Sequence, residues 1–174
     1  MNKKCIMIAC AFFVAVALQA KVSLPAFFSD GMVMQQQSQA SLWGNASKGK
    51  IVEVTTGWDG QTYTTRADEQ GKWKLTVQTP AAGGPYDITF DDGERTRIKD
   101  ILMGELWICS GQSNMEMPMK GFKNQPVEDA NMDVLRSRNS QIRLFTVKRN
   151  SQFAPVDDVT GCWNHAEPKT VREF

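Results

Sequence analysis

The 174-residue chain contains a single histidine, two tyrosines and four cysteines, and neither sign of charge is in excess. Lysine and arginine together number 20, against 19 aspartate and glutamate residues. This near-balance argues against a nucleic-acid-binding protein, because proteins that bind nucleic-acid backbones usually carry a marked basic excess. The lone histidine means that a histidine-dependent hydrolase would have to use His165 or a histidine from outside the chain.

The composition that is present indicates a soluble globular protein. Apolar residues make up 41% of the chain and charged residues 22%, which does not fit a disordered tail. The 13 glycines and seven prolines are typical of a β protein rich in turns. The length suits one ordinary domain or two small ones.

Residues 1–20 have the pattern of a secretory signal peptide. Two lysines precede an apolar run, and small-residue cleavage sites end at Ala17 and Ala20, of which Ala20 is favoured. The run is about 14 residues long, shorter than the roughly 20 that a membrane helix needs. A membrane anchor is therefore the weaker alternative, as is a lipoprotein at Cys10, because the apolar stretch continues past that residue. We expect an exported protein, periplasmic or extracellular, with no stable membrane span after signal removal.

Removal of the signal peptide leaves two cysteines, Cys109 and Cys162. An exported compartment permits a disulfide between them. Cys109 lies in an apolar run, however, and we expect two unpaired thiols.

Residues 21–100 predict an all-β, sandwich-like domain. Short alternating runs rich in Thr, Val, Ile and aromatic residues are separated by turns that contain glycine. In one run Trp73, Leu75 and Val77 share a face, as in a half-buried strand. Similar runs cover residues 41–44, 51–56, 61–66, 86–90 and 95–99. Several strands at this spacing are typical of a sandwich.

Three tryptophans in this region, Trp43, Trp58 and Trp73, are candidate sugar contacts, since exposed aromatic rings on a β domain stack on sugars. The favoured interpretation is that Trp43 and Trp73 fill the core. Trp58 lies beside a turn, and the sequence does not decide whether its ring fills the core or is exposed.

Residues 101–174 predict a different architecture. Residues 101–109 are almost continuously apolar, as in a buried parallel strand. A small polar turn, a helix over residues 126–137 and a strand over 141–147 follow. This order predicts the start of an α/β layer on a parallel sheet, which places reactive residues just beyond the C-terminal ends of strands. Residues 110–114 occupy that position.

Ser113 is the candidate nucleophile. A serine at the mouth of a strand, in a turn that contains glycine, has access to substrate and to backbone donors for an oxyanion. Taken alone the pattern is weak evidence for catalysis, and a turn in which Ser and Asn satisfy local backbone groups is the favoured interpretation.

Longer stretches of the chain resemble a known family. The stretch GELWICSGQSNMEMP, residues 104–118, resembles the first block of the sialate O-acetylesterase family, which belongs to the SGNH hydrolases. LPAFFSDGMVMQQ, residues 24–36, resembles the N-terminal β domain of that family, as do shorter stretches at residues 43–44, 67–73 and 82–86. IRLFTV, residues 142–147, resembles the second strand of the catalytic domain.

The resemblance implies a fold and a reaction. The fold would be an all-β sandwich-like domain followed by the incomplete start of an α/β, flavodoxin-like SGNH hydrolase domain over residues 101–174. Ser113 would attack an O-acetyl ester of sialic acid or a related acetylated sugar, and water would release the acetyl group. Gly111 would allow close approach of the backbone, and Gln112 and Asn114 would line the oxyanion hole or bind substrate. No metal or organic cofactor is implied.

The chain departs from the family in its catalytic base. The family draws the Asp and His of its triad from near the end of the catalytic domain, and the segment around His165 does not match that Asp-x-x-His block. We expect His165 to be a loop or surface residue. Loss of the base alone costs about 10⁶ in kcat in a serine hydrolase, so the chain by itself should be inactive.

Three hypotheses follow from the sequence. The first is an acetylesterase, present here as the N-terminal portion of a longer enzyme. The second is a non-catalytic carbohydrate-binding or scaffold β module, and the third is a remnant with no function of its own.

Overall fold

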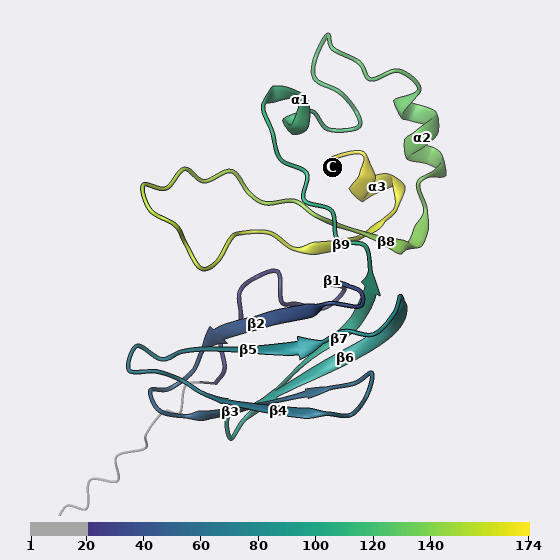
Figure 1. Ribbon diagram of the computed structural model, residues 1–174. Helices are drawn as coiled ribbons and strands as arrows, with labels where there is room; N and C mark the ends of the chain where they lie inside the picture. Colours follow the sequence, from purple (N-terminus) through teal and green to yellow (C-terminus); the bar gives the residue numbers. More distant parts are fainter. Residues whose placement is uncertain (1–20) are drawn as a thin grey trace, which may run out of the picture.

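The computed structural model describes residues 21–174. The predicted signal peptide lies outside the described residues and stays a prediction. The described chain is mostly β, with a lower unit of strands and an upper part that carries the short helices (Figure 1). No helix within residues 21–174 is long and apolar enough to cross a membrane.

The lower unit, here called the β unit, extends from residue 22 to residue 104. Its strands are β1 (Val33–Gln35), β2 (Gln39–Asn45), β3 (Ile51–Thr56), β4 (Thr62–Arg66), β5 (Lys72–Gln78), β6 (Gly83–Asp91) and β7 (Arg95–Gly104). One sheet has the order β1-β7-β6-β3-β4, with β1 parallel to β7 and the other pairs antiparallel. The remaining strands, β2 and β5, form an antiparallel ribbon.

The core lies between the five-stranded sheet and this ribbon. β3 and β6 bury Val54 and Phe90 completely, and the Trp73 ring on β5 lies 5.9 Å from the Phe90 ring, centroid to centroid. The large sheet curls so that β4 meets β5, where the Thr65 hydroxyl donates to the Lys74 carbonyl at 3.1 Å. The β unit is therefore a curled mixed sheet, a half-barrel, covered by a two-stranded ribbon.

Alternation along the strands explains this packing. On β5, Trp73 and Val77 are buried while Lys72, Lys74 and Thr76 are exposed. Because successive side chains of a strand point to opposite faces, one face supplies the core and the other remains in water.

The upper part contains three short helices and a hairpin. The helices are α1 (Ser113–Glu116), α2 (Ala130–Arg136) and α3 (Pro168–Val171), and the hairpin strands are β8 (Asn139–Phe145) and β9 (Trp163–Ala166). β8 and β9 pair antiparallel. A long loop, residues 146–162, joins them and extends to the left in Figure 1.

The predicted parallel α/β layer is not complete within the described residues. Residues 101–104 form the end of β7, where residues 102–104 pair with β1, and residues 105–110 belong to no strand and are exposed. The strand predicted over 141–147 is β8, but its partner is β9 and the pairing is antiparallel. The predicted helix over 126–137 is shorter than expected, because Asp129 has a left-handed backbone and regular helix begins only at Ala130.

β7 continues four residues past position 100, where the sequence places the end of the β domain. Ile101, Leu102 and Met103 are buried, and Leu102 and Met103 lie opposite β1 residues in the parallel pairing. The division of the chain into domains at this point stays a prediction.

A truncation series tests where the β unit ends. We expect residues 21–104 to fold alone and residues 21–100 to remain unfolded, because the shorter piece loses three buried apolar side chains. That loss is worth about 5 kcal/mol or more, comparable with the whole stability of a small domain. Thermal unfolding followed by circular dichroism measures this. Equal melting temperatures for the two pieces would contradict it.

Candidate functional site

Ser113 is the first residue of α1 and is exposed. Gln112 precedes the helix in extended conformation, and its carbonyl accepts a hydrogen bond from the Met115 N–H at 2.9 Å. At this first helical position the backbone N–H of Ser113 has no acceptor within the helix. An exposed hydroxyl and an uncommitted N–H are thus carried by the same residue.

The other predicted site residues, Gly111, Gln112 and Asn114, are also exposed. These residues are adjacent in sequence, but no hydrogen bond joins the side chains of residues 111–114 in the described structure. A Cβ atom on Gly111 would lie 2.6 Å from Cγ of Met115, so a larger residue would have to displace that side chain. The space beside Met115 therefore favours a residue without a side chain at position 111. The catalytic roles of all four residues stay predictions.

The segment that leads to Ser113 is anchored at its start by Glu105. The carboxylate of Glu105 accepts hydrogen bonds from the side-chain amides of Gln36, at 2.7 Å, and Gln35, at 3.0 Å. These bonds hold the pKa of Glu105 below its ordinary value. The Gln35 amide oxygen in turn accepts the N–H of Leu106 at 2.9 Å. The end of β1 thus fixes the direction in which the chain leaves β7.

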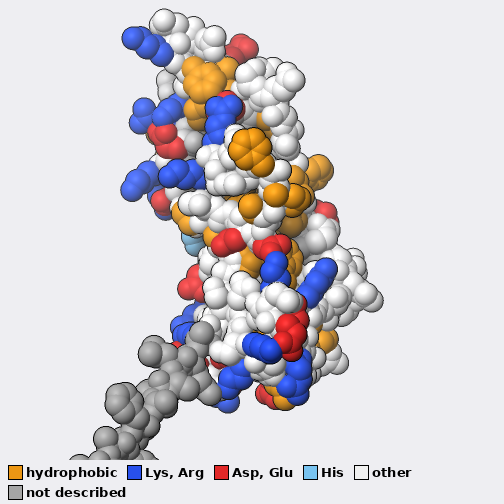
Figure 2. All heavy atoms as spheres, turned by 90° about the vertical axis from the view of Figure 1, so that its left-hand side faces the viewer, with side chains coloured by type: hydrophobic (Ala, Val, Ile, Leu, Met, Phe, Trp, Pro, Cys, Tyr) orange, Lys and Arg blue, Asp and Glu red, His pale blue; other side chains and the backbone are white. Residues whose placement is uncertain are grey.

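Beyond this anchor the segment exposes apolar side chains. Trp107 is 81% exposed and Ile108 is 89% exposed. Figure 2 shows apolar side chains gathered on the upper half of one face of the molecule, which is the part built from residues 105–174. Ser113 therefore follows a stretch whose sequence is suited to burial but which no part of the described chain covers.

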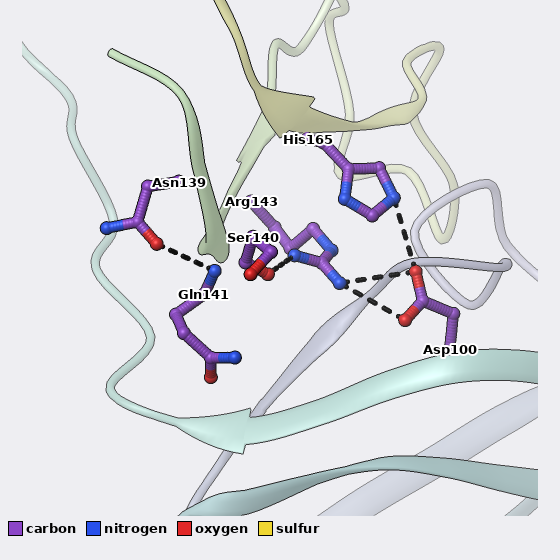
Figure 3. A network of polar contacts seen from close by, with 6 residues as sticks. All are labelled: Asp100, Asn139, Ser140, Gln141, Arg143 and His165. Carbon is purple, nitrogen blue, oxygen red and sulfur yellow. Dashed lines mark hydrogen bonds and ion pairs between the residues drawn. The ribbon is translucent and has the colours of Figure 1, made fainter. Parts of the chain in front are cut away.

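His165 lies on β9 and takes part in a polar network (Figure 3). Its Nε2 lies 3.3 Å from Oδ2 of Asp100, and its side chain is 57% exposed. The same Asp100 carboxylate accepts two hydrogen bonds from Nη2 of Arg143 on β8, at 3.1 and 3.2 Å. No hydrogen bond joins His165 to Ser113 within residues 21–174.

Arg143 is the buried member of the network, with a side chain that is only 3% exposed. Its Nη1 donates to the backbone carbonyl of Ser140, and the nearby Gln141 N–H is held by Asn139 at 2.8 Å. Asp100 adopts a left-handed backbone, with φ of 57°, at the point where it meets the arginine. The network joins the hairpin to the β unit and gives His165 a structural partner.

The sequence contains no signal for this network. Asp100 and Arg143 are 43 residues apart, and although Arg143 lies in the stretch 142–147 that resembles the family, nothing in that stretch points to Asp100, so only the fold shows that they meet. The hydrogen bond from Trp163 Nε1 to the Phe27 carbonyl, at 2.8 Å, spans 136 residues and is equally invisible in the sequence.

The tryptophans and cysteines have clear positions. Trp73 is 3% exposed and lies in the core, whereas Trp43 and Trp58 are half-buried against it. Cys109 and Cys162 are both exposed and unpaired. Among residues 21–174 no three His, Cys, Asp or Glu side chains gather in a way that could hold a metal ion.

Comparisons with known proteins show a distant similarity to sialate O-acetylesterases, which confirms the resemblance seen in the sequence. The chain is 28% identical to the mouse protein of that name over 144 residues, and 29% identical to the human one over 143. These matches cover 77% and 76% of this chain but only 26% and 27% of the relatives. The chain thus spans about a quarter of the length of the curated relatives it matches. No protein-family model matches it.

A solved structure extends the similarity to the fold. A carbohydrate acetylesterase from Xanthomonas citri is 32% identical and matches with a TM-score of 0.80. The match covers 88% of this chain and 34% of the Xanthomonas protein.

The network at Asp100 predicts the effect of removing its arginine. Arg143→Met should loosen the β8–β9 hairpin from the β unit, because hydrogen bonds to charged groups contribute about 2 kcal/mol. Hydrogen exchange at Trp163–Ala166 should accelerate while exchange in β3 and β6 stays unchanged. Arg138→Met is the matched control, since Arg138 is exposed and has no ion pair in the described chain. Equal protection of β9 in both variants would contradict the assignment.

The lowered pKa of Glu105 predicts an acid-sensitive anchor. A depressed folded-state pKa means that this carboxylate stabilises the fold above its unfolded pKa, and that the contribution is lost as the pH falls through the folded pKa. As the pH falls from neutral through the folded-state pKa of Glu105, which lies below the ordinary value, the side-chain NH₂ signals of Gln35 and Gln36 should shift with protonation of Glu105. In Glu105→Gln that titration should disappear. Its persistence in the variant would assign the shift to another group.

Proposed function

We propose that this chain carries the nucleophile of a carbohydrate O-acetylesterase, with Ser113 as the attacking residue. The observation that supports this most directly is the placement of Ser113, exposed at the start of α1 with an uncommitted backbone N–H. Distant similarity to sialate O-acetylesterases and to a carbohydrate acetylesterase structure supports the same conclusion.

In the proposed reaction the Ser113 hydroxyl attacks the acetyl carbonyl, and its proton passes to a base. The negative charge that develops on the carbonyl oxygen is stabilised by the Ser113 backbone N–H, with Gln112 and Asn114 as further donors. The sugar hydroxyl leaves, and water then hydrolyses the acetyl-enzyme. Gly111 keeps the approach to the reacting atoms clear.

The proposed reaction needs a base that residues 21–174 do not place beside Ser113. His165, the one histidine of the chain, is engaged by Asp100, whose carboxylate is also held by Arg143. We therefore propose that an Asp–His pair outside the described residues completes the site. The same additional chain would cover Trp107 and Ile108 and turn residues 105–109 into a strand of an α/β layer of the SGNH, flavodoxin-like type, with Ser113 just beyond the end of that strand.

The proposed substrate is an acetylated sugar, of which O-acetylated sialic acid is the example given by the names of the relatives. The signal-peptide pattern of residues 1–20 supports action in the periplasm or outside the cell.

A non-catalytic carbohydrate-binding or scaffold module is the second candidate. It is favoured by the β unit, which holds nearly all of the core cluster and does not depend on residues 105–118 for its packing. The two candidates differ in whether Ser113 is needed for activity.

A chimera tests the catalytic proposal. Residues 21–174 would replace the matching part of the Xanthomonas carbohydrate acetylesterase, whose remaining chain supplies the missing neighbours. We expect turnover of p-nitrophenyl acetate and of O-acetylated sialic acid, and a loss of about 10³-fold or more in kcat for Ser113→Ala.

Ser110→Ala is the matched control, because Ser110 lies three residues away in the same exposed stretch. It should retain most of the activity. A folded, active chimera in which Ser113→Ala has the same rate as the parent would remove Ser113 from the mechanism and favour the non-catalytic candidate.

A further inference from the structure

The β8–β9 loop, residues 146–162, touches both the β unit and the helix that carries Ser113. In Figure 1 the loop extends to the left, with α1 above it and β2 below it. It forms hydrogen bonds and ion pairs with both neighbours, and we call it the strap. The strap is therefore a segment through which a change in the β unit can reach α1.

The lower side of the strap is held at two adjacent residues, Asp157 and Asp158. The Trp43 indole Nε1 donates to the Asp157 carbonyl at 3.4 Å, and the Ala26 N–H donates to the Asp158 carboxylate at 2.7 Å. The Lys72 ammonium forms an ion pair with the Asp157 carboxylate. Three separate segments of the β unit thus fix the strap at this point.

The upper side of the strap holds α1 through Arg149. Nη1 of Arg149 donates to Oε1 of Glu116 at 2.9 Å. In the described chain this is the only side-chain hydrogen bond formed by residues 113–116, and none of these residues is buried. A helix of four residues is marginal on its own, because helix formation requires a costly nucleus. The position of α1, and of Ser113 at its start, therefore depends on few contacts, of which this ion pair is one.

The two legs of the strap pack closely together near its base. The Lys148 N–H donates to the Thr160 carbonyl at 2.8 Å. A Cβ atom on Gly161 would lie 2.5 Å from Cε1 of the Phe145 ring and 2.7 Å from the Thr146 carbonyl oxygen, which is too close for any side chain. Lys148 immediately precedes the residue that holds α1, and Thr160 comes two positions after the residues that the β unit holds. The two points of attachment are therefore joined through this close contact.

We propose that the strap couples the β unit to α1, which makes Lys72 of the β unit a positioning residue for Ser113. The path is contiguous, since Lys72 holds Asp157, the base of the strap joins its two legs, and Arg149 holds α1. Contiguous chains of packed groups and ion pairs carry energetic coupling between sites. The effect on catalysis rests on the proposed function, whereas the coupling from Lys72 to α1 can be measured without it.

The coupling is limited in strength because both ion pairs are exposed. The Lys72 and Arg149 side chains are 59% and 84% exposed, and an exposed ion pair changes an equilibrium by about fivefold at most. Removal of the Lys72 charge should therefore loosen α1 without unfolding the chain. The dependence has one direction, since the core cluster of the β unit includes no residue of α1 or of the strap.

The first test follows the backbone amide signals of Ser113 and Glu116 in ¹⁵N–¹H correlation spectra of the chain, without any substrate. Lys72→Met and Arg149→Met should shift these signals in the same direction, because both substitutions release the same helix. Lys74→Met is the matched control and should leave the signals in place, since Lys74 is exposed on the same strand and has no ion pair in the described chain. Lys72→Arg, which keeps the cation, should restore the parent positions.

A double variant separates coupling from a local effect. Lys72→Met in an Arg149→Met background should add no further shift at Ser113 and Glu116, because the strap no longer holds α1. Parent-like α1 signals in Lys72→Met would overturn the proposal, and so would shifts that simply add in the double variant.

The second test measures turnover of p-nitrophenyl acetate by the chimera with the Xanthomonas enzyme. Lys72→Met should lower kcat about two- to fivefold and leave KM unchanged, and Lys72→Arg should recover the parent rate. An unchanged kcat in an active chimera would remove Lys72 as a positioning residue, and a lower kcat without a shift of the α1 signals would overturn the coupling. Shifted α1 signals together with equal rates for the parent and Ser113→Ala would support the coupling and remove the proposed function instead.

Discussion

The ion pair between Asp100 and Arg143 is the contact on which the arrangement of the upper part depends. A guanidinium that is 3% exposed is costly to bury unless a carboxylate meets it, and Asp100 adopts a left-handed backbone at the one place where it does so. The pair positions β8, and β9 follows through its strand pairing, with Trp163 resting on the core and bonded to Phe27. The loop between the two strands is thereby held over the β2–β5 ribbon.

The segment that carries Ser113 shows the opposite situation. It is fixed where it leaves the β unit, by Glu105, and has no strand beside it afterwards. Its apolar residues would be stabilised by burial, but within the described chain they remain in water. Fold and proposed chemistry are therefore separable in this molecule. The β unit is held by its own core, whereas the segment that leads to Ser113 leaves Trp107 and Ile108 exposed within residues 21–174.

Period-two alternation predicted much of the β unit because strands such as β3 and β5 alternate between buried and exposed residues. The run 51–56 is β3, and 73–77 lies within β5. The continuously apolar run 101–109 predicted a buried parallel strand, and this holds only for its first four residues, since such a run indicates burial without saying which partner provides it. Residues 101–104 pack within the β unit, whereas residues 105–109 are exposed in the described chain. Ser113 could be selected from a local motif, whereas the pairs Asp100–Arg143 and Trp163–Phe27 are contacts between distant residues, which local patterns do not record.

The contacts that hold the β8–β9 loop against the β unit also determine the order in which parts of the chain can fold. The strands of the β unit are complete once residue 104 has been synthesised. The hydrogen bonds from Trp43 to the Asp157 carbonyl and from the Ala26 N–H to the Asp158 carboxylate span 114 and 132 residues. Contacts this distant in sequence form late, because the intervening chain must first be made and ordered. The order of synthesis therefore allows the β unit to fold before the β8–β9 loop is in place against it.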